Sequence, residues 1–334
     1  MDFVTGGTGL LGSHVLLALT ERHRKIRAIY CDYERVKHIH QLFLLIDPIH
    51  GEQRWDLIEW VKGDILDIQS LQEHIEKKDD VYHCAGLVSF DPQRFHQVMK
   101  INREGTANVV NVCLEKGIRK MCHVSSTAAI GGQPNTLTTE ETHWKDDEGN
   151  SGYAYSKYAA EREVWRGIEE GLTAVIVNPS VLFGAGNWDE SSMTMFRTVE
   201  NGLPFYTSGQ NAFVDARDVA EIMLRLMESE IESQRYLCIA ENLPFKHILS
   251  QIAEGMSKKS PHISTPKWLT GIAWRLSWFV SRLRGHSPTI TRETAVSAYR
   301  TMSYSNEKVR KALSVNFRPM AETIEYATCY RLKK

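Results

Sequence analysis

The stretch TGGTGLLG, residues 5–12, follows the apolar run at residues 3–5 and comes directly before a helical pattern. Its glycines Gly6, Gly9 and Gly12 have the spacing GxxGxxG. In a strand–turn–helix unit, the first glycine permits a tight turn, the second lets backbone approach a pyrophosphate, and the third lets helix and strand pack closely. The helix N-terminus attracts the phosphates. The stretch predicts a dinucleotide-binding turn, with a glycine-rich turn lacking a ligand as the alternative.

The composition is that of an ordinary globular protein. The 334 residues include 40 Lys and Arg against 41 Asp and Glu, a net charge of -1, which favours neither nucleic acid nor an acidic surface as a partner. Six cysteines form no CxxC pair and no metal-ligand cluster, so we expect a reduced cytoplasmic protein without a metal site. Neither a secretory signal nor a membrane-spanning segment is expected.

Short β-branched runs alternate with helical patterns through the first half of the chain, which is typical of βαβ units. Strands are predicted at residues 3–5, 26–30, 58–64, around Val81, 121–126 and 174–180. They predict an α/β fold with a Rossmann-like, doubly wound parallel sheet, which binds ligands at the carboxyl ends of its strands. We expect a dinucleotide-binding domain over 1–180 and a smaller C-terminal substrate lobe over 181–334. The segment near 211–230 should return to the Rossmann core, and the apolar run RYLCIA, 235–240, is assigned to the smaller lobe.

Two strand ends bear on the adenosine half of the cofactor. An acid after the second strand binds ribose hydroxyls, whereas a basic residue accommodates a 2′-phosphate. Here Cys31 and Asp32 come first and Arg35 follows, with a solvated helix face as the alternative role for Arg35. After the third strand, Asp64 could accept the adenine amino group while Ile65 lies against the ring; an exposed turn acid is the alternative.

The segment YAYSK, residues 153–157, places Tyr153 and Lys157 four positions apart and so on one helix face. Tyrosine has an ordinary pKa near 10, and a neighbouring ammonium favours its phenolate, which suits acid–base catalysis. Tyr155 has only Ala159 at the equivalent position. Because Tyr/Lys pairs are common on helices, a purely structural pair is the alternative.

A third candidate is HVSSTAAIG, residues 123–131, where Ser125, Ser126 and Thr127 end a predicted strand. A hydroxyl at this edge of the sheet could hydrogen-bond a substrate carbonyl or alkoxide. Ser and Thr at strand ends are also ordinary capping residues.

The motifs TGGTGLLG, GDILD, HCAG, INREGT, VSST and YAYSK, in this order, resemble the extended short-chain dehydrogenase/reductase family, also known as the NAD-dependent epimerase/dehydratase family. NPSVLFGAG (178–186), FVDARDVA (213–220) and SYSNEKVRKAL (303–313) extend the resemblance over nearly the whole chain. The resemblance implies a nicotinamide cofactor, no metal, and a homodimer paired through helices near 102–116 and 153–171.

The resemblance also implies roles for individual residues. Tyr153 is the catalytic acid/base, and Lys157 tunes it and holds the nicotinamide ribose. Thr127 aligns with the catalytic Ser/Thr of the family, with Ser126 as the second choice. The implied cofactor-binding residues are Gly6, Thr8, Gly9, Leu10, Leu11, Gly12, Cys31, Asp32, Arg35, Asp64, Ile65, Ala85, Gly86, Asn102, Tyr153, Lys157, Pro179 and Val181.

Within the family, residues 26–43, 83–92 and 265–285 are similar to the branch of dihydroflavonol reductases and 3β-hydroxysteroid dehydrogenases, which act on lipophilic or aromatic carbonyls. Ala128 stands where dehydratases carry an acid, and Asn211 where nucleotide-sugar enzymes tend to carry an Arg. We expect an NAD(P)-dependent oxidoreductase that interconverts such a ketone and its secondary alcohol. NADP is favoured and NAD is left open, since NADP-dependent members of the branch carry an Arg where Cys31 stands. The alternatives are an NAD-dependent sugar-nucleotide epimerase and a non-catalytic NADP-binding regulator.

Two further sets of residues concern the substrate. Val88, Phe90, Trp188 and Phe205 lie on expected loops and are candidates for its pocket. Within residues 267–284, apolar side chains recur at helical spacing among Lys and Arg. Core packing or a pocket lid is one interpretation of this helix, and a helix at a membrane surface that collects lipid-like substrates is the other. The apolar positions are Trp268, Leu269, Ile272, Leu276, Phe279, Val280 and Leu283.

Overall fold

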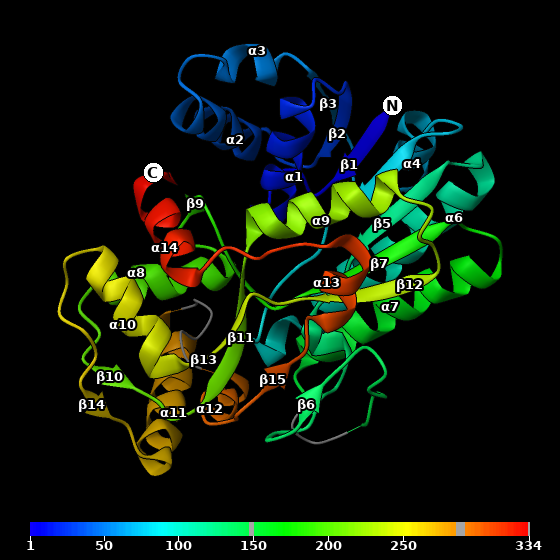
Figure 1. Ribbon diagram of the computed structural model, residues 1–334. Helices are drawn as coiled ribbons and strands as arrows, with labels where there is room; N and C mark the ends of the chain where they lie inside the picture. The colour runs from blue at the N-terminus through cyan, green and yellow to red at the C-terminus, as the bar shows by residue number, and fades with distance from the viewer. Residues whose placement is uncertain (147–149, 285–290, 333–334) are drawn as a thin grey trace.

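A seven-stranded parallel sheet forms the centre of the protein, with the strand order β12-β7-β5-β4-β1-β2-β3 (Figure 1). The computed structural model describes residues 1–146, 150–284 and 291–332, the side chains of 276–284 excepted. The order reverses between β1 and β4, as it does in doubly wound folds. The predicted α/β fold with a Rossmann-like sheet is therefore confirmed. The strands are β1 (Asp2–Thr5), β2 (Ile26–Tyr30), β3 (Ile58–Lys62), β4 (Asp80–His83), β5 (Lys120–Val124), β7 (Ala174–Pro179) and β12 (Gln234–Cys238).

The run RYLCIA was wrongly assigned to the smaller lobe. Its residues form β12, which pairs in parallel with β7 at the edge of the main sheet. Tyr236 and Cys238 pack into the same apolar cluster as Val175 and Val177 of β7. Burial of these alternate side chains accounts for the pairing, since neither strand could cover them alone.

Helices cover both faces of the sheet (Figure 1). On β7, Val175 and Val177 face a cluster formed with α1 and α9, whereas Ala174 and Ile176 face a cluster formed with α6 and α7. This alternation explains why the strand is apolar at successive positions: both of its faces are buried. The helices of these layers are α1 (Leu10–Glu21), α2 (Tyr33–Ile46), α4 (Ile68–His74), α6 (Gly105–Lys116), α7 (Gly152–Glu169) and α9 (Ala216–Glu228).

The second half of the chain builds a smaller assembly beside the sheet, seen at the lower left of Figure 1. Its core contains Phe183, Phe196, Phe213, Ile248 and Ile324. The segment at 216–228 leaves this assembly and packs as α9 along α1. The assembly comprises β8 (Val181–Phe183), β11 (Gln210–Asp215) and β13 (Glu241–Pro244) in one sheet, with α8 (Thr194–Glu200), α10 (Phe245–Gly255) and α14 (Met320–Cys329). The domain division at residue 180 stays a prediction.

Shorter elements connect these layers. In the described part of the chain, no helix is both long enough and apolar enough to cross a bilayer. Within the same residues, no three His, Cys, Asp or Glu side chains are grouped to hold a metal ion. The remaining elements are α3 (Gly51–Trp55), η1 (Pro92–Arg94), α5 (Phe95–Met99), η2 (Lys100–Glu104), η3 (Thr127–Ala129), β6 (Leu137–Thr138), β9 (Gly186–Asn187), η4 (Ser191–Met193), β10 (Phe205–Tyr206), β14 (Ile263–Ser264), α11 (Lys267–Arg284), α12 (Arg292–Ser297), β15 (Ser303–Tyr304), α13 (Glu307–Leu313) and β16 (Arg331–Leu332).

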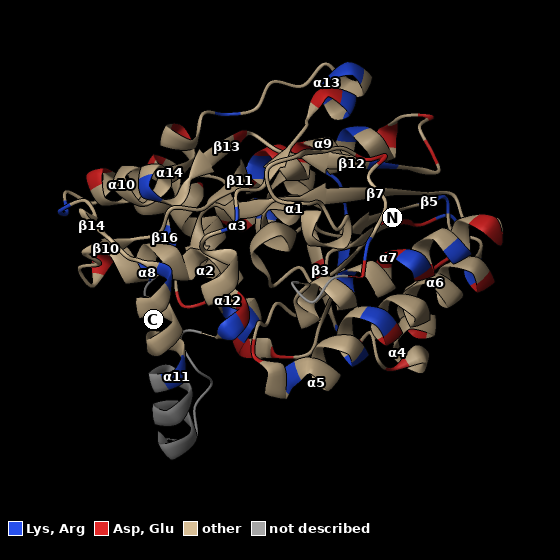
Figure 2. Cartoon of the chain, turned by 90° about the horizontal axis from the view of Figure 1, so that it is seen from below, with Lys and Arg blue, Asp and Glu red and all other residues tan. Residues whose placement is uncertain are grey.

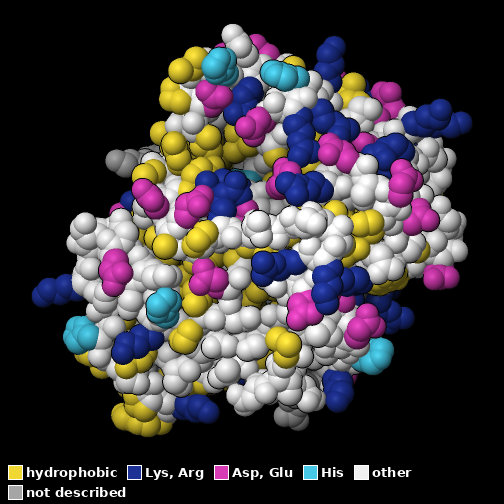
Figure 3. Space-filling view, in the orientation of Figure 1, with side chains coloured by type: hydrophobic (Ala, Val, Ile, Leu, Met, Phe, Trp, Pro, Cys, Tyr) yellow, Lys and Arg dark blue, Asp and Glu magenta, His cyan; other side chains and the backbone are white. Residues whose placement is uncertain are grey.

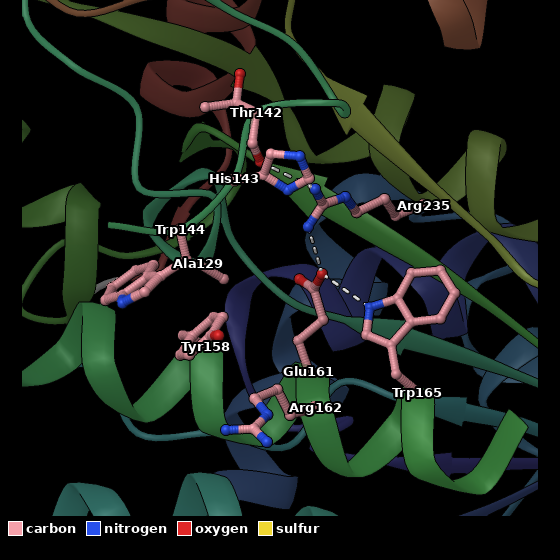
Figure 4. A pocket seen from close by; sticks show the side chains of 9 residues that line it. All are labelled: Ala129, Thr142, His143, Trp144, Tyr158, Glu161, Arg162, Trp165 and Arg235. Atoms are coloured by element: carbon pink, nitrogen blue, oxygen red, sulfur yellow. Dashed lines mark hydrogen bonds and ion pairs between the residues drawn. The ribbon is translucent and has the colours of Figure 1, made fainter. Parts of the chain in front are cut away.

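A buried carboxylate, Glu161, ties α7 to the sheet (Figure 4). One of its oxygens accepts hydrogen bonds from Ser125 Oγ at 2.6 Å and Asn178 Nδ2 at 2.7 Å. The other accepts from Arg235 Nη1 at 3.0 Å and from Trp165 Nε1 at 3.3 Å. Ser125 follows β5, Asn178 lies in β7 and Arg235 in β12, so a single side chain joins three strands to one helix. A pocket of about 310 Å³ opens beside this cluster, and none of the residues that line it is a predicted site residue.

Replacing this carboxylate should weaken the fold. We expect Glu161→Gln to lower the free energy of unfolding by about 3 kcal/mol. Arg235 would lose its counter-charge, and the NH₂ group of the new glutamine side chain would face hydrogen-bond donors where the carboxylate had accepted from them. Glu170→Gln is the matched control. Glu170 is the C-cap residue of α7 and forms an exposed ion pair with Arg166, and removing its charge should lower the free energy of unfolding by less than about 1 kcal/mol. Chemical denaturation measures both, and equal effects would contradict the assigned role of Glu161.

Candidate functional site

The predicted site residues converge on one edge of the sheet, because each group follows a parallel strand and these strands end together. Residues 6–12 follow β1, residues 31–35 follow β2, and Asp64 and Ile65 follow β3. Ala85 and Gly86 follow β4, the hydroxyl residues follow β5, and Pro179 ends β7 with Val181 just beyond it. Tyr153 lies in the first turn of α7, one turn before Lys157.

The glycine turn has the geometry of a phosphate cradle. Gly6 has a φ of 69°, which favours glycine, and a Cβ there would lie 2.5 Å from the backbone nitrogen of Ala85. A Cβ on Gly12 would lie 2.1 Å from the carbonyl oxygen of Gly6. Gly9 is the N-cap of α1, and no side chain caps the helix there. The backbone N–H groups of this helix start therefore fit the pyrophosphate of a dinucleotide. Thr8 and Leu10 flank Gly9 and are partly exposed, whereas Leu11 is buried in the core.

The ends of β2 and β3 hold exposed polar groups. Asp32 caps α2 by accepting a hydrogen bond from Glu34 N at 3.0 Å, and Cys31 Sγ donates to the carbonyl of Gly63 at 3.2 Å. Arg35 is ion-paired with Glu190, a residue of the second half of the chain. Arg35, the residue expected to bind a 2′-phosphate, therefore lies where the two halves of the chain are in contact.

The end of β3 combines an exposed acid with a buried apolar side chain. Asp64 is exposed and accepts a hydrogen bond from Leu66 N at 2.9 Å. The side chain of Ile65 is buried in the core, where it lies against Gly105: a Cβ on Gly105 would lie 2.5 Å from it. Its proposed contact with the adenine ring stays a prediction.

Asn102 holds the loop after β4 in place. Its Oδ1 accepts from Leu87 N at 2.7 Å, and its Nδ2 donates to the Leu87 carbonyl at 3.0 Å and to Ser156 Oγ at 2.8 Å. Asn102 lies in η2, a π-helical turn, and such turns are often found at functional sites. Gly86 lies close by: a Cβ there would be 3.3 Å from Asn102 Oδ1 and 3.5 Å from Lys157 Nζ.

The side chain of Ser126 lies close enough to Tyr153 to lower the pKa of its phenol, and Ser126 Oγ accepts a hydrogen bond from Ala128 N at 3.2 Å. Thr127, the first choice from the sequence, lies close enough to Tyr304 of β15 to lower the pKa of that phenol. Ser126 is the extended N-cap residue of η3, and Thr127 is the first residue of that 3-10 turn. Lys157 is buried and donates from Nζ to the carbonyl of Val124 at 2.8 Å.

Burial dominates the acid–base properties of this group. It raises the pKa of Tyr153 to about 12, and the neighbouring Ser126 side chain offsets part of that rise. It lowers the pKa of Lys157 to about 8, although the nearby Glu161 carboxylate acts in the opposite direction. The sequence argument expected the ammonium of Lys157 to favour the phenolate of Tyr153. In the structure desolvation outweighs such an effect, so the phenol of Tyr153 is protonated at neutral pH.

Two buried histidines lie beneath the site. His83 of β4 and His123 of β5 have ring centroids 5.1 Å apart. His83 is hydrogen-bonded to Thr5 Oγ1 at 2.7 Å and to Thr106 Oγ1 at 3.0 Å. Burial, together with the charge of Lys157, lowers the pKa of His83 to about 3, and burial also holds the pKa of His123 well below its usual range. Both rings are therefore neutral and add no charge near Lys157.

Apolar side chains border Tyr153. The ring of Phe90 meets the ring of Tyr153 edge to face, with centroids 5.5 Å apart. Val88, Phe90 and Phe95 are all partly exposed on this side of the molecule. Of the other two expected pocket residues, Trp188 is buried against Phe196 in the second core, and Phe205 lies on the exposed strand β10. The expectation for Trp188 was wrong, because its ring fills that core.

Sequence reasoning missed three contributors to the site. Ser156 connects Asn102 to α7, since its Oγ accepts from Asn102 and donates to the carbonyl of Tyr153 at 2.7 Å. Glu161 continues the four-residue spacing of Tyr153 and Lys157, a pattern that could have identified it. Glu293 of α12 accepts from Gly152 N at 3.3 Å at the start of α7, and no local motif signals this long-range contact.

Known proteins resemble this chain in sequence and in fold. The model of the NAD-dependent epimerase/dehydratase family matches residues 3–239. The chain is 28% identical over 277 residues to sterol demethylase protein B of Methylococcus capsulatus, covering 81% of this chain and 79% of that protein. It is 28% identical over 274 residues to cinnamoyl-CoA reductase 1 of Petunia hybrida, covering 79% and 78% of the two chains. The crystal structure of gox2253 superposes with a TM-score of 0.79 at 26% identity, over 99% of this chain and 97% of that one.

The family match covers more than half of the chain and includes the glycine turn, the hydroxyl residues after β5 and the Tyr153/Lys157 helix. It confirms the family expected from the motifs. The chain therefore belongs to the NAD-dependent epimerase/dehydratase family and is an NAD(P)-dependent oxidoreductase of the extended short-chain dehydrogenase/reductase type.

Proposed function

We propose that the protein interconverts a lipophilic or aromatic ketone and its secondary alcohol, with Tyr153 as the proton donor and acceptor. The observation that carries this proposal is the position of Tyr153: its phenol lies beside the Ser126 hydroxyl, and its ring is bordered by the apolar side chain of Phe90. The similarity to a cinnamoyl-CoA reductase and to a sterol demethylase protein supports a substrate of low polarity.

The cofactor proposal is NADP, held along the edge of the sheet. The turn at 6–12 would hold the pyrophosphate, and Lys157 and Asn102 would hold the nicotinamide ribose. Arg35 would bind the 2′-phosphate after exchanging its exposed partner Glu190, which costs little because exposed ion pairs are weak. A bound nicotinamide supplies the hydride in reduction and accepts it in oxidation.

The protein's own residues would handle the proton. At neutral pH Tyr153 is a phenol, the form needed to donate a proton to the oxygen of a ketone as that oxygen gains negative charge. The Ser126 hydroxyl, which lies beside the phenol of Tyr153, would orient the same oxygen. We therefore propose Ser126 in place of Thr127 as the catalytic hydroxyl, with Thr127 serving to fix β15 through Tyr304.

An epimerase would use the same tyrosine on a sugar hydroxyl, and the family as a whole includes such enzymes. The apolar side chains beside Tyr153 favour the reductase. Asn211 also favours it, because its Oδ1 accepts from Ala212 N at 2.9 Å and supplies no positive charge for a nucleotide diphosphate. For a non-catalytic regulator, the buried acid–base group would have no use.

Cofactor exchange distinguishes the first two functions. A reductase must release its cofactor in each cycle, so we expect the purified protein, once denatured, to release much less than one equivalent of nicotinamide cofactor. Titration should show NADPH binding about tenfold more tightly than NADH, a difference that Arg35→Ser removes. Lys37→Ser is the control, since Lys37 is an equally exposed cation on the same helix, paired with Glu34. Near-stoichiometric release of NAD would indicate an epimerase instead.

Loss of the phenol should abolish catalysis while leaving the cofactor site intact. We expect Tyr153→Phe to lower kcat for ketone reduction at least about 100-fold, the range typical of a lost acid–base group. The Kd for NADPH should change less than about twofold. Tyr155→Phe is the control, because the Tyr155 ring packs on Trp144 rather than on Phe90. Turnover by Tyr153→Phe at the unmodified rate would refute the mechanism.

The choice between the two hydroxyl residues can be tested directly. Ser126→Ala should lower kcat about tenfold or more, because the reacting oxygen loses a hydrogen bond. Thr127→Val should leave kcat within about threefold but lower the unfolding free energy by about 1 kcal/mol, because Tyr304 loses its partner. A large loss of kcat in Thr127→Val, with little change in Ser126→Ala, would instead indicate Thr127 as the catalytic hydroxyl residue.

A further inference from the structure

One segment of the chain is strongly one-sided in charge. Residues 255–292 contain no Asp or Glu, although an even spread of the chain's 41 acidic residues would place about five there. The same segment holds seven basic residues in a protein whose net charge is only -1. They are Lys258, Lys259, Lys267, Arg275, Arg282, Arg284 and Arg292.

The same region exposes large apolar side chains. Trp268 is 67% exposed and Ile272 is 48% exposed; they are four residues apart and so share a face of α11. Leu269 beside them is 37% exposed. Phe205 and Ile263, each 43% exposed, lie opposite one another across the β10–β14 pair that leads into α11. We call these five residues the α11 patch.

Basic side chains accompany the patch, and the positions of Lys and Arg along the chain are blue in Figure 2. Lys246 lies over the Tyr206 ring at 4.9 Å, and Arg275 over the Trp274 ring at 4.5 Å. Figure 3 shows hydrophobic side chains gathered at the lower end of α11, with Lys or Arg side chains on either side. The predicted continuation of the apolar face, at Leu276, Phe279, Val280 and Leu283, lies outside the described side chains.

We propose that the α11 patch binds the surface of an anionic phospholipid membrane. Exposed Trp, Leu and Ile side chains on a helix rich in Lys and Arg suit the boundary between headgroups and acyl chains, and the basic residues suit the lipid phosphates. A second copy of the chain is a poorer occupant, because a two-fold interface would bring two acid-free, basic segments together. Large exposed apolar side chains at one site indicate a binding surface rather than chance exposure.

The patch is connected to the reaction site. The helix α11 packs on α12, whose Glu293 accepts a hydrogen bond from Gly152 N, next to Tyr153. Tyr299, just after α12, donates from its hydroxyl to the carbonyl of Thr265, just before α11, at 2.9 Å. A membrane-bound enzyme would thus receive an apolar substrate close to Tyr153. This connection rests on the proposed function, whereas the membrane binding itself does not.

The test is co-sedimentation of the full chain with phosphatidylcholine vesicles, prepared with and without phosphatidylglycerol. We expect binding to the vesicles that contain phosphatidylglycerol, weaker binding to phosphatidylcholine alone, and a decrease with added salt. The double variant Trp268→Ser, Ile272→Ser should lose at least about tenfold in affinity. Ile49→Ser is the matched control, since Ile49 is an isoleucine 81% exposed outside the patch, and it should bind like the parent protein.

Thermal unfolding and NADPH binding of each variant show whether it is folded. Absence of binding to anionic vesicles by the folded parent protein would overturn the proposal, as would equal losses in the patch variant and the control. If the patch variant binds vesicles like the parent protein but sediments as a monomer where the parent sediments as a dimer, the patch joins two copies of the chain instead. Because no substrate is added, failure of ketone reduction would leave this result unaffected.

Discussion

The hydrogen-bonded carboxylate of Glu161 is the interaction on which the site depends most. A buried charge is tolerated only when its partners compensate for lost water, and Glu161 has four donors, two on each oxygen. Three of these donors are Ser125, directly after β5, Asn178 of β7 and Arg235 of β12. Together they fix the rotation of α7 about its axis and its position along the sheet. Lys157 lies one turn earlier and Tyr153 two turns earlier on the same face. The placement of the reacting groups at the edge of the sheet follows from that attachment.

The second half of the chain reaches this edge at three separate points. Tyr304 lies beside Thr127, Glu293 accepts a hydrogen bond from the start of α7, and Glu190 pairs with Arg35. Two of these contacts join the second half of the chain to α7 or to the hydroxyl residues beside it, and the third lies on the expected cofactor side. Cofactor and substrate would therefore meet surfaces supplied by both halves, a general property of sites between two lobes.

Local signals account for most of what the sequence could predict. Each of the six expected strands is an apolar run bounded by turn residues, and all six are present within two residues at either end. The strand order and the partner of β12 depend on contacts between distant segments, which a local pattern does not encode. The choice between Ser126 and Thr127 depends on where the strand gives way to the 3-10 turn η3, because Ser126 is the last extended residue and Thr127 the first residue of the turn. Trp188 was misplaced for a similar reason, since an aromatic residue in a loop can fill a core or line a pocket.

The π-helical turn that carries Asn102 constrains the length of the chain as well as its sequence. Such a turn contains one more residue than the α-helical turn it replaces. Deleting a single residue between Lys100 and Glu104 would restore an ordinary helix and rotate the preceding residues by about 100°. Asn102 would then no longer face both Leu87 and Ser156. The number of residues between the loop after β4 and α6 therefore cannot change without loss of these contacts. Insertions and deletions should be less well tolerated there than in other connecting segments.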